Sequence, residues 1–194
     1  MLNLTLTTTN IKAAIFCAAN KDSRYYLNGV HIRIEADNCV YVESINGSAA
    51  FQTVEKKLAD TDQKGPFSII IPLAAAKTAA KTKSPRLTLA ALPDGRYSLG
   101  DVIFAALDGI FPNVDRIIPP KEPFIGPVPV FDAALLNKVQ SAMRTANNSK
   151  GVFYSMWALS LDGGRGYNST FLVAAKNETY PRCVICGIRE SALS

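Results

Sequence analysis

The sequence predicts an α+β fold built from three similar units, each consisting of a strand, a short helix and then three strands. Strand-sized runs alternate apolar and polar residues, whereas short Ala-rich segments carry apolar residues at helical spacing. These patterns follow one another in the same order three times along the 194 residues. A Pro-rich stretch at residues 111–129 separates the second unit from the third, excludes a helix and favours an extended connector.

The first unit begins with an alternating strand at residues 2–7, followed by a helix at 10–19 with Asn10 as its expected N-cap. The strands expected next span residues 25–35, 39–44 and 49–54. In the first of these, His31 and Arg33 alternate with Val30, Ile32 and Ile34, which predicts a solvated outer face. A lone histidine on such a face does not indicate general acid–base catalysis.

In the second unit, a strand at residues 67–71 runs into Pro72, which suits the first turn of a helix at 73–82. The strands expected next span residues 86–92, 96–99 and 102–107. In the third unit Asp132 should cap a helix that ends near Ala146. Its expected strands span residues 152–161, 169–175 and 183–188, and we place the domain boundary between residues 121 and 122.

The predicted helices carry cations and almost no acids. The cations on such a helix face repel one another unless a polyanion lies opposite. The pattern therefore indicates binding to the phosphates of double-stranded DNA, without readout of the base sequence. The alternative is an ordinary solvated helix face. The candidate DNA-binding residues are Lys12, Lys21, Lys77, Lys81, Lys83, Lys138, Arg144 and Lys150.

The four cysteines are expected to be free thiols. Cys183 and Cys186 have the spacing of a zinc or redox motif, but they fall in a predicted strand, where positions three apart point to opposite faces. Packing is therefore favoured over a structural zinc or a thiol enzyme. Because no phosphate loop, nucleophile elbow or dinucleotide motif is present, we expect no enzymatic activity and no cofactor.

Composition favours a cytoplasmic protein with polyanionic partners. The net charge is +5, and 48% of the residues are apolar, enough for a sizeable core. No apolar run approaches the length of a membrane span, so no membrane partner is expected. The alternating N-terminus reads as a strand and not as a secretion signal.

Three motifs resemble the bacterial DNA polymerase sliding clamp: RYYLNGV at residues 24–30, SIIIP at 68–72 and FPNVDRIIP at 111–119. Residues 1–121 resemble the middle domain of that family's subunit, a full clamp domain. Residues 122–194 resemble the second half of its C-terminal domain, with CVICGIR at 183–189 in place of the terminal strand and arginine. The resemblance implies a shortened DNA-clamp fold in a bacterial cytoplasm.

The resemblance also implies an apolar pocket for peptides of a DNA polymerase or other replication proteins. The matching positions are Arg24, Leu27, Gly47, Pro72, Val184, Ile185, Cys186, Ile188 and Arg189. The segment INGSAA at residues 45–50 departs from the family, which carries threonine, aspartate, glycine, histidine, arginine and leucine there. Loss of the large side chains is expected to widen or flatten the pocket and to alter the preferred peptide.

Three units imply a homo-oligomer, because the family's subunit has six and its ring twelve. Four copies would complete a ring, whereas two copies paired through their third units would leave an open arc. The sequence thus predicts a processivity factor that tethers a polymerase to DNA. Its rival is a clamp-derived adaptor or decoy that binds replication-protein peptides without encircling DNA.

Overall fold

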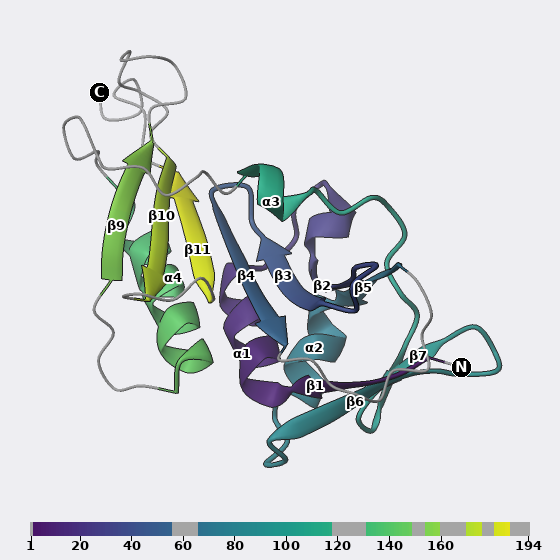
Figure 1. The fold of residues 1–194 in the computed structure, drawn as a ribbon. Coiled ribbons are helices and arrows are strands. Elements are labelled where there is room, and N and C mark those ends of the chain that lie inside the picture. The colour runs from purple at the N-terminus through teal and green to yellow at the C-terminus, as the bar shows by residue number, and fades with distance from the viewer. Residues whose placement is uncertain are drawn as a thin grey trace.

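In the computed structural model, the described residues form two β-sheets and a row of helices (Figure 1). The structure describes residues 2–55, 66–117, 131–148, 154–159, 170–175 and 181–186, with the fourth and fifth stretches described by their backbone alone. The predicted domain boundary between residues 121 and 122 lies outside these stretches.

The first unit has the predicted order, with a different start to its helix. Its elements are β1 (Asn3–Thr7), α1 (Thr8–Cys17), η1 (Tyr25–Leu27), β2 (Gly29–Ile34), β3 (Val40–Ile45) and β4 (Ala49–Glu55). The expected cap at Asn10 is wrong, because Thr7 is the N-cap and makes no side-chain capping bond. Asn10 lies inside α1, where its amide donates to Glu55 Oε1 at 2.9 Å.

The strand predicted from residue 25 starts at Gly29 instead, after a 3₁₀ turn at Tyr25–Leu27. Gly29 pairs with Pro72 at the end of the neighbouring strand β5. A Cβ atom on Gly29 would lie 2.5 Å from the carbonyl oxygen of Ile71, closer than a side chain can approach. The glycine in RYYLNGV is therefore required by the close approach of two strands.

The second unit contains one helical turn that the prolines were expected to forbid. Its elements are β5 (Phe67–Pro72), α2 (Leu73–Ala79), β6 (Arg86–Ala91), β7 (Tyr97–Leu99), β8 (Val102–Phe104) and α3 (Val114–Ile117). Pro72 is the N-cap of α2. The exclusion of a helix is wrong for α3, because a single turn fits after Pro112 without placing a proline in a helix interior.

The third unit contributes α4 (Ala133–Ala146), β9 (Tyr154–Leu159), β10 (Thr170–Ala175) and β11 (Arg182–Cys186). The predicted cap is confirmed, since Asp132 Oδ1 accepts from the backbone nitrogens of Ala134 at 2.7 Å and Leu135 at 3.3 Å. The strand expected to open this unit falls outside the described residues.

The first two units exchange their opening strands. β1 pairs with β6 of the second unit, and β5 pairs with β2 of the first, which gives a four-stranded sheet β1-β6-β7-β8. The other sheet has seven strands in the order β5-β2-β3-β4-β11-β10-β9. Because β11 pairs with β4, the third unit extends the sheet of the first (Figure 1).

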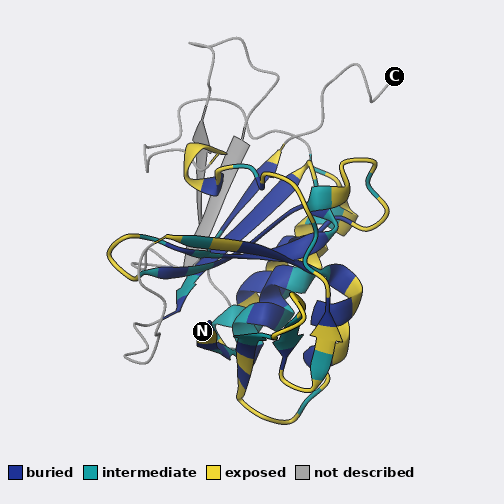
Figure 2. Ribbon diagram, turned by 90° about the vertical axis from the view of Figure 1, so that its right-hand side faces the viewer, coloured by how far each residue is buried: buried dark blue, intermediate teal, exposed yellow. Residues whose placement is uncertain are grey.

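The helices α4, α1 and α2 cover one face of the seven-stranded sheet, which we call its helix face. α1 packs on β3 and β4, α4 on β4 and β11, and α2 contacts strands of both sheets. Figure 2 shows these strands buried, with exposed residues concentrated on loops and outward helix surfaces. The main core lies here, and Phe51 is among its largest fully buried side chains.

The opposite, outer face of the seven-stranded sheet is not solvated at β2 as expected. The predicted alternation holds, since Val30, Ile32 and Ile34 all join the helix-face core. His31, however, is only 4% exposed. The Phe111 ring stacks on its imidazole at a centroid distance of 4.4 Å, so a segment far along the chain covers this part of the sheet.

Candidate functional site

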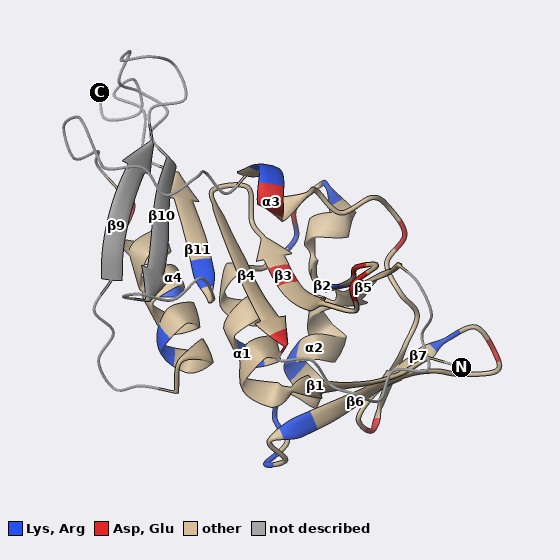
Figure 3. Ribbon diagram, in the orientation of Figure 1, with Lys and Arg blue, Asp and Glu red and all other residues tan. Residues whose placement is uncertain are grey.

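Three adjacent helices present cations without carboxylates. No Asp or Glu occurs within α1, α2 or α4, whereas each carries at least one Lys or Arg (Figure 3). Of the predicted cations, Lys77 on α2 and Lys138 and Arg144 on α4 are exposed, and Lys12 on α1 is half-buried. Lys81 and Lys83 lie just beyond α2, which ends earlier than expected.

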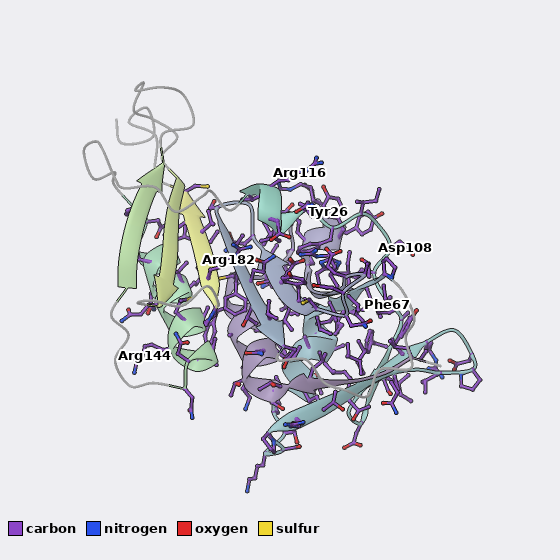
Figure 4. The ribbon with its side chains drawn as sticks, viewed as in Figure 1. Tyr26, Phe67, Asp108, Arg116, Arg144 and Arg182 are labelled. Carbon is purple, nitrogen blue, oxygen red and sulfur yellow. The ribbon has the colours of Figure 1, made fainter. Side chains whose placement is uncertain are left out.

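Five of the eight predicted DNA-binding residues line cavities, in two groups. Lys12, Lys77 and Lys81 surround one small cavity, the helix pocket, which is completed by Ile15, Phe16, Ala80 and Thr145. Lys21 and Lys138 instead line a larger cavity next to the predicted peptide residues. Arg144 lies on α4, far from Arg116 on α3 (Figure 4). Lys150 falls outside the described residues.

The larger cavity, which we call the groove, has a volume of about 810 Å³. It lies where the end of α1, the β3–β4 turn, the start of α4 and the end of β11 meet. The groove is lined by Ala18, Ala19, Asn20, Lys21, Asp22, Asn46, Ser48, Asp132, Ala134, Leu135, Lys138 and Cys186. Because β11 joins β4, residues from the first and third units share one concave surface.

The structure brings some of the predicted peptide residues to the groove and separates others from it. Cys186 lines it directly. Leu27 and Val184 are buried in a small apolar cluster that also contains the groove residue Ala19. Ile185 instead lies in the helix-face core, since neighbouring strand residues face opposite ways.

The remaining predicted peptide residues differ in position. Gly47 and Arg24 lie beside the groove, in the same turn region as Ser48 and Asp22. Pro72 lies at the junction of β5 and α2 and does not line the groove. Ile188 and Arg189 fall outside the described residues.

An ion pair orders the rim of the groove. Arg24 Nη2 lies 2.8 Å from Asp22 Oδ2. The side-chain hydrogen bond from Arg24, aided by its backbone N–H, lowers the pKa of Asp22 to about 2. Gly47 has φ +88°, and a Cβ atom there would lie 2.7 Å from Arg24 Nη2. The glycine therefore suits both the backbone turn and the guanidinium beside it.

A buried polar network crosses the outer face of the seven-stranded sheet. Glu43 on β3 accepts from His31 Nδ1 at 2.8 Å, from Arg33 Nη2 at 2.9 Å and from Gln52 Nε2 at 2.6 Å. Since a carboxylate only accepts, His31 carries its proton on Nδ1. Burial alone would raise the pKa of Glu43, but these hydrogen bonds outweigh burial and lower it.

Asp115 on α3 connects this network to the third unit. Its carboxylate lies 2.7 Å from Arg33 Nη2 on β2 and 2.7 Å from Arg182 Nη2 on β11. It also accepts from Gln52 on β4 at 3.1 Å. Figure 4 shows Arg182 on β11 at the border with β4. One side chain therefore contacts strands of two units.

The two cysteines of the CVIC motif point to different environments, as predicted. Cys183 is fully buried and Cys186 is exposed. Burial, together with a hydrogen bond to Cys17 on α1, raises the pKa of the Cys183 thiol. Among the described residues, no group of three or more His, Cys, Asp or Glu side chains could hold a metal ion.

Several groove residues escaped the sequence reasoning. The sequence predicts Asp132 as a helix cap but gives no reason to place it, or Leu135 three residues later, at a binding site. Asn46 and Ser48 lie within the INGSAA segment, whose predicted feature is the loss of the clamp family's large side chains. Only the pairing of β11 with β4 places the start of α4 opposite that turn. No local sequence signal carries this information.

Comparison with solved structures shows many bacterial DNA polymerase sliding clamps. A sliding clamp from Pseudomonas aeruginosa is 14% identical with a TM-score of 0.71, covering 97% of this chain and 67% of that one. A griselimycin-bound clamp from the same organism is 15% identical with a TM-score of 0.58, covering 97% and 65%. The polymerase III β subunit from Thermotoga maritima is 18% identical with a TM-score of 0.50, covering 96% and 49%.

These similarities define a protein with the DNA-clamp fold. The predicted α+β fold class is confirmed, and the chain spans between about half and two thirds of the length of the clamps compared. The particular likeness is to the bacterial polymerase sliding clamps, as the motifs indicated. No protein-family model and no curated protein matches the sequence. Among the described residues, no helix is long and apolar enough to span a membrane.

Proposed function

We propose that this protein is a reduced sliding clamp, a non-enzymatic factor that holds replication proteins on double-stranded DNA. The observation that carries the proposal is the layer of three adjacent helices that bear cations and no carboxylates, in a chain with the DNA-clamp fold. Exposed ammonium groups release counterions from DNA wherever they meet phosphates, and they do so without reading bases.

The groove is the proposed docking site for a peptide of a DNA polymerase or another replication protein. Its floor is supported by the apolar cluster that contains Leu27 and Val184. Lys21, Lys138, Asp22 and Asp132 also line it, so the groove offers both signs of charge, which suits a peptide that carries apolar and charged residues. The small side chain of Ser48 makes the β3–β4 wall low, so we expect a broader anchor residue than in the family.

Self-assembly completes the proposal. β9 ends the seven-stranded sheet, and among the described strands it pairs with β10 alone. An exposed strand edge offers backbone hydrogen bonds to a second copy. We propose that copies associate through their third units, as a dimer or as a closed tetramer, and that they act on cytoplasmic DNA. The proposed domains remain residues 1–121 and 122–194.

The test measures binding to duplex DNA by fluorescence anisotropy over a series of salt concentrations. We expect a steep loss of affinity with salt and no dependence on sequence. The double variant Lys77→Gln/Lys81→Gln should bind more weakly. Its salt slope should be shallower by about 0.9 for each phosphate contact removed.

The matched control is Arg96→Gln/Arg116→Gln, which removes the same charge from exposed positions outside the helix layer. It should bind DNA nearly as wild type does. Equal weakening by both double variants would show that net charge alone matters and would overturn the helix interface. A wild-type protein that does not bind duplex DNA would overturn the function itself.

A further inference from the structure

The helix pocket combines features that phosphate binding alone does not require. Its volume is about 280 Å³, and it lies between α1 and α2 with Thr145 of α4 at its edge. Ile15, Phe16 and Ala80 provide an apolar lining. Phe16 is 40% exposed and lines the pocket together with the three lysines. This exposure leaves an aromatic surface available to a partner.

The charges around the pocket are all of one sign. Lys12, Lys77 and Lys81 line it, and none of the lining residues is a carboxylate. An occupant of complementary chemistry is therefore anionic at its rim and apolar or aromatic at its centre. The volume falls below the range of about 300–1,000 Å³ typical for drug-sized ligands and suits a single ring system.

A nucleotide unit with an unstacked base has this chemistry. In a duplex the base faces are covered by their neighbours, so duplex DNA offers only phosphates and sugars to the pocket. In single-stranded DNA a base is free to stack on an aromatic side chain while cations hold the flanking phosphates. The exposed ring and the three ammonium groups match these two requirements.

We propose that the helix pocket binds one unstacked base of single-stranded DNA, stacked on Phe16, with flanking phosphates held by Lys12, Lys77 and Lys81. This inference rests on the proposed DNA-binding function of the helix layer and adds to it a preference for single-stranded segments. The protein then recognises single-stranded segments through a contact that duplex DNA cannot make. Such segments adjoin duplex DNA wherever a strand is being copied.

The experiment compares a labelled single-stranded oligothymidine with a duplex of the same length by fluorescence anisotropy at one salt concentration. Phe16→Ala should weaken single-strand binding by about five-fold or more and leave duplex binding within about two-fold. Phe16→Leu keeps most of the apolar bulk, so it protects the fold, and it should show the same selective loss. Ile110→Ala, at a position that is 91% exposed outside the pocket, should change neither.

Photocrosslinking gives a second measurement that needs no variant. An oligonucleotide carrying bromodeoxyuridine should crosslink to the peptide that contains Phe16. Phe16 variants that bind single strands as wild type does would overturn the proposal. If duplex binding still depended on Lys77 and Lys81, the proposed DNA-binding function would be unaffected by that result. Equal weakening of single-strand and duplex binding would also overturn the stacking contact.

Discussion

The two faces of the seven-stranded sheet are built on different principles. The helix face is closed by α1, α2 and α4 over an apolar core that contains the fully buried Phe51. The outer face carries a network of charged and polar side chains beside a small apolar cluster. The strands are the same, but alternate residues point to opposite faces, so Val30 and Ile32 join the helix-face core whereas Arg33 joins the outer network.

The two faces therefore have different roles: one stabilises the packed layers, and the other connects the third unit to the first. Apolar burial on the helix face is non-directional and holds the layers together. The outer network is directional, and through Asp115 it contacts β2, β4 and β11 at defined positions. We infer that the helix face supplies most of the stability and that the outer face fixes how the third unit sits against the first.

The largest expected loss of stability follows from a substitution in the core of the helix face. Phe51→Ala removes a fully buried ring from the core and should lower the free energy of unfolding by about 4 kcal/mol. Urea denaturation measures the change. The exposed Ile110→Ala variant should lie close to wild type. A loss below about 1 kcal/mol at Phe51 would contradict the assignment of stability to this face.

An intermediate loss of stability is expected when Glu43, at the centre of the outer network, is replaced. Glu43→Gln leaves His31 and Arg33 without a buried charged partner and should cost about 3 kcal/mol at neutral pH. Glu35→Gln, on a half-exposed carboxylate next to the same network, should cost less than about 1 kcal/mol.

The pH dependence sharpens this prediction. The folded-state pKa of Glu43 is lowered from 4.5, so its contribution is fully present above that value and is lost as the pH falls through the lower, folded-state pKa. Wild type should therefore lose stability on acidification more steeply than Glu43→Gln. If the free energy of unfolding, measured by urea denaturation, changed with pH in the same way for wild type and Glu43→Gln, the charge of Glu43 would contribute nothing to stability.

The smallest effect is expected at Asp115, whose side chain is 41% exposed. Asp115→Asn should lower the free energy of unfolding by about 1 kcal/mol, because solvent screens its ion pairs. Hydrogen exchange should nevertheless rise at β11 more than at β3, since Asp115 connects Arg182 to the rest of the sheet. Equal exchange at both strands would argue against this connecting role.

The sequence predicted local features well because local chemistry determines them. The alternation at Val30, Ile32 and Ile34 placed one face of β2 in the core, and Asp132 capped its helix as expected. The opposite orientations of Cys183 and Cys186 followed from strand geometry alone. Each of these inferences needed only residues within a few positions.

Long-range contacts decided the rest. His31 has the neighbours of an exposed residue, yet Phe111 covers it from eighty positions further along the chain. The groove escaped prediction for a similar reason, since Asp132 and Ser48 meet only because β11 pairs with β4.

The exchange of β1 and β5 between the first two units has a consequence for biosynthesis. Neither unit holds a complete sheet until the partner strand has been made, because β1 must wait for β6. The first unit therefore leaves the ribosome before the strand that pairs with β1, and its unsatisfied strand edge is prone to aggregation. The first two units therefore complete their sheets together, once both have emerged.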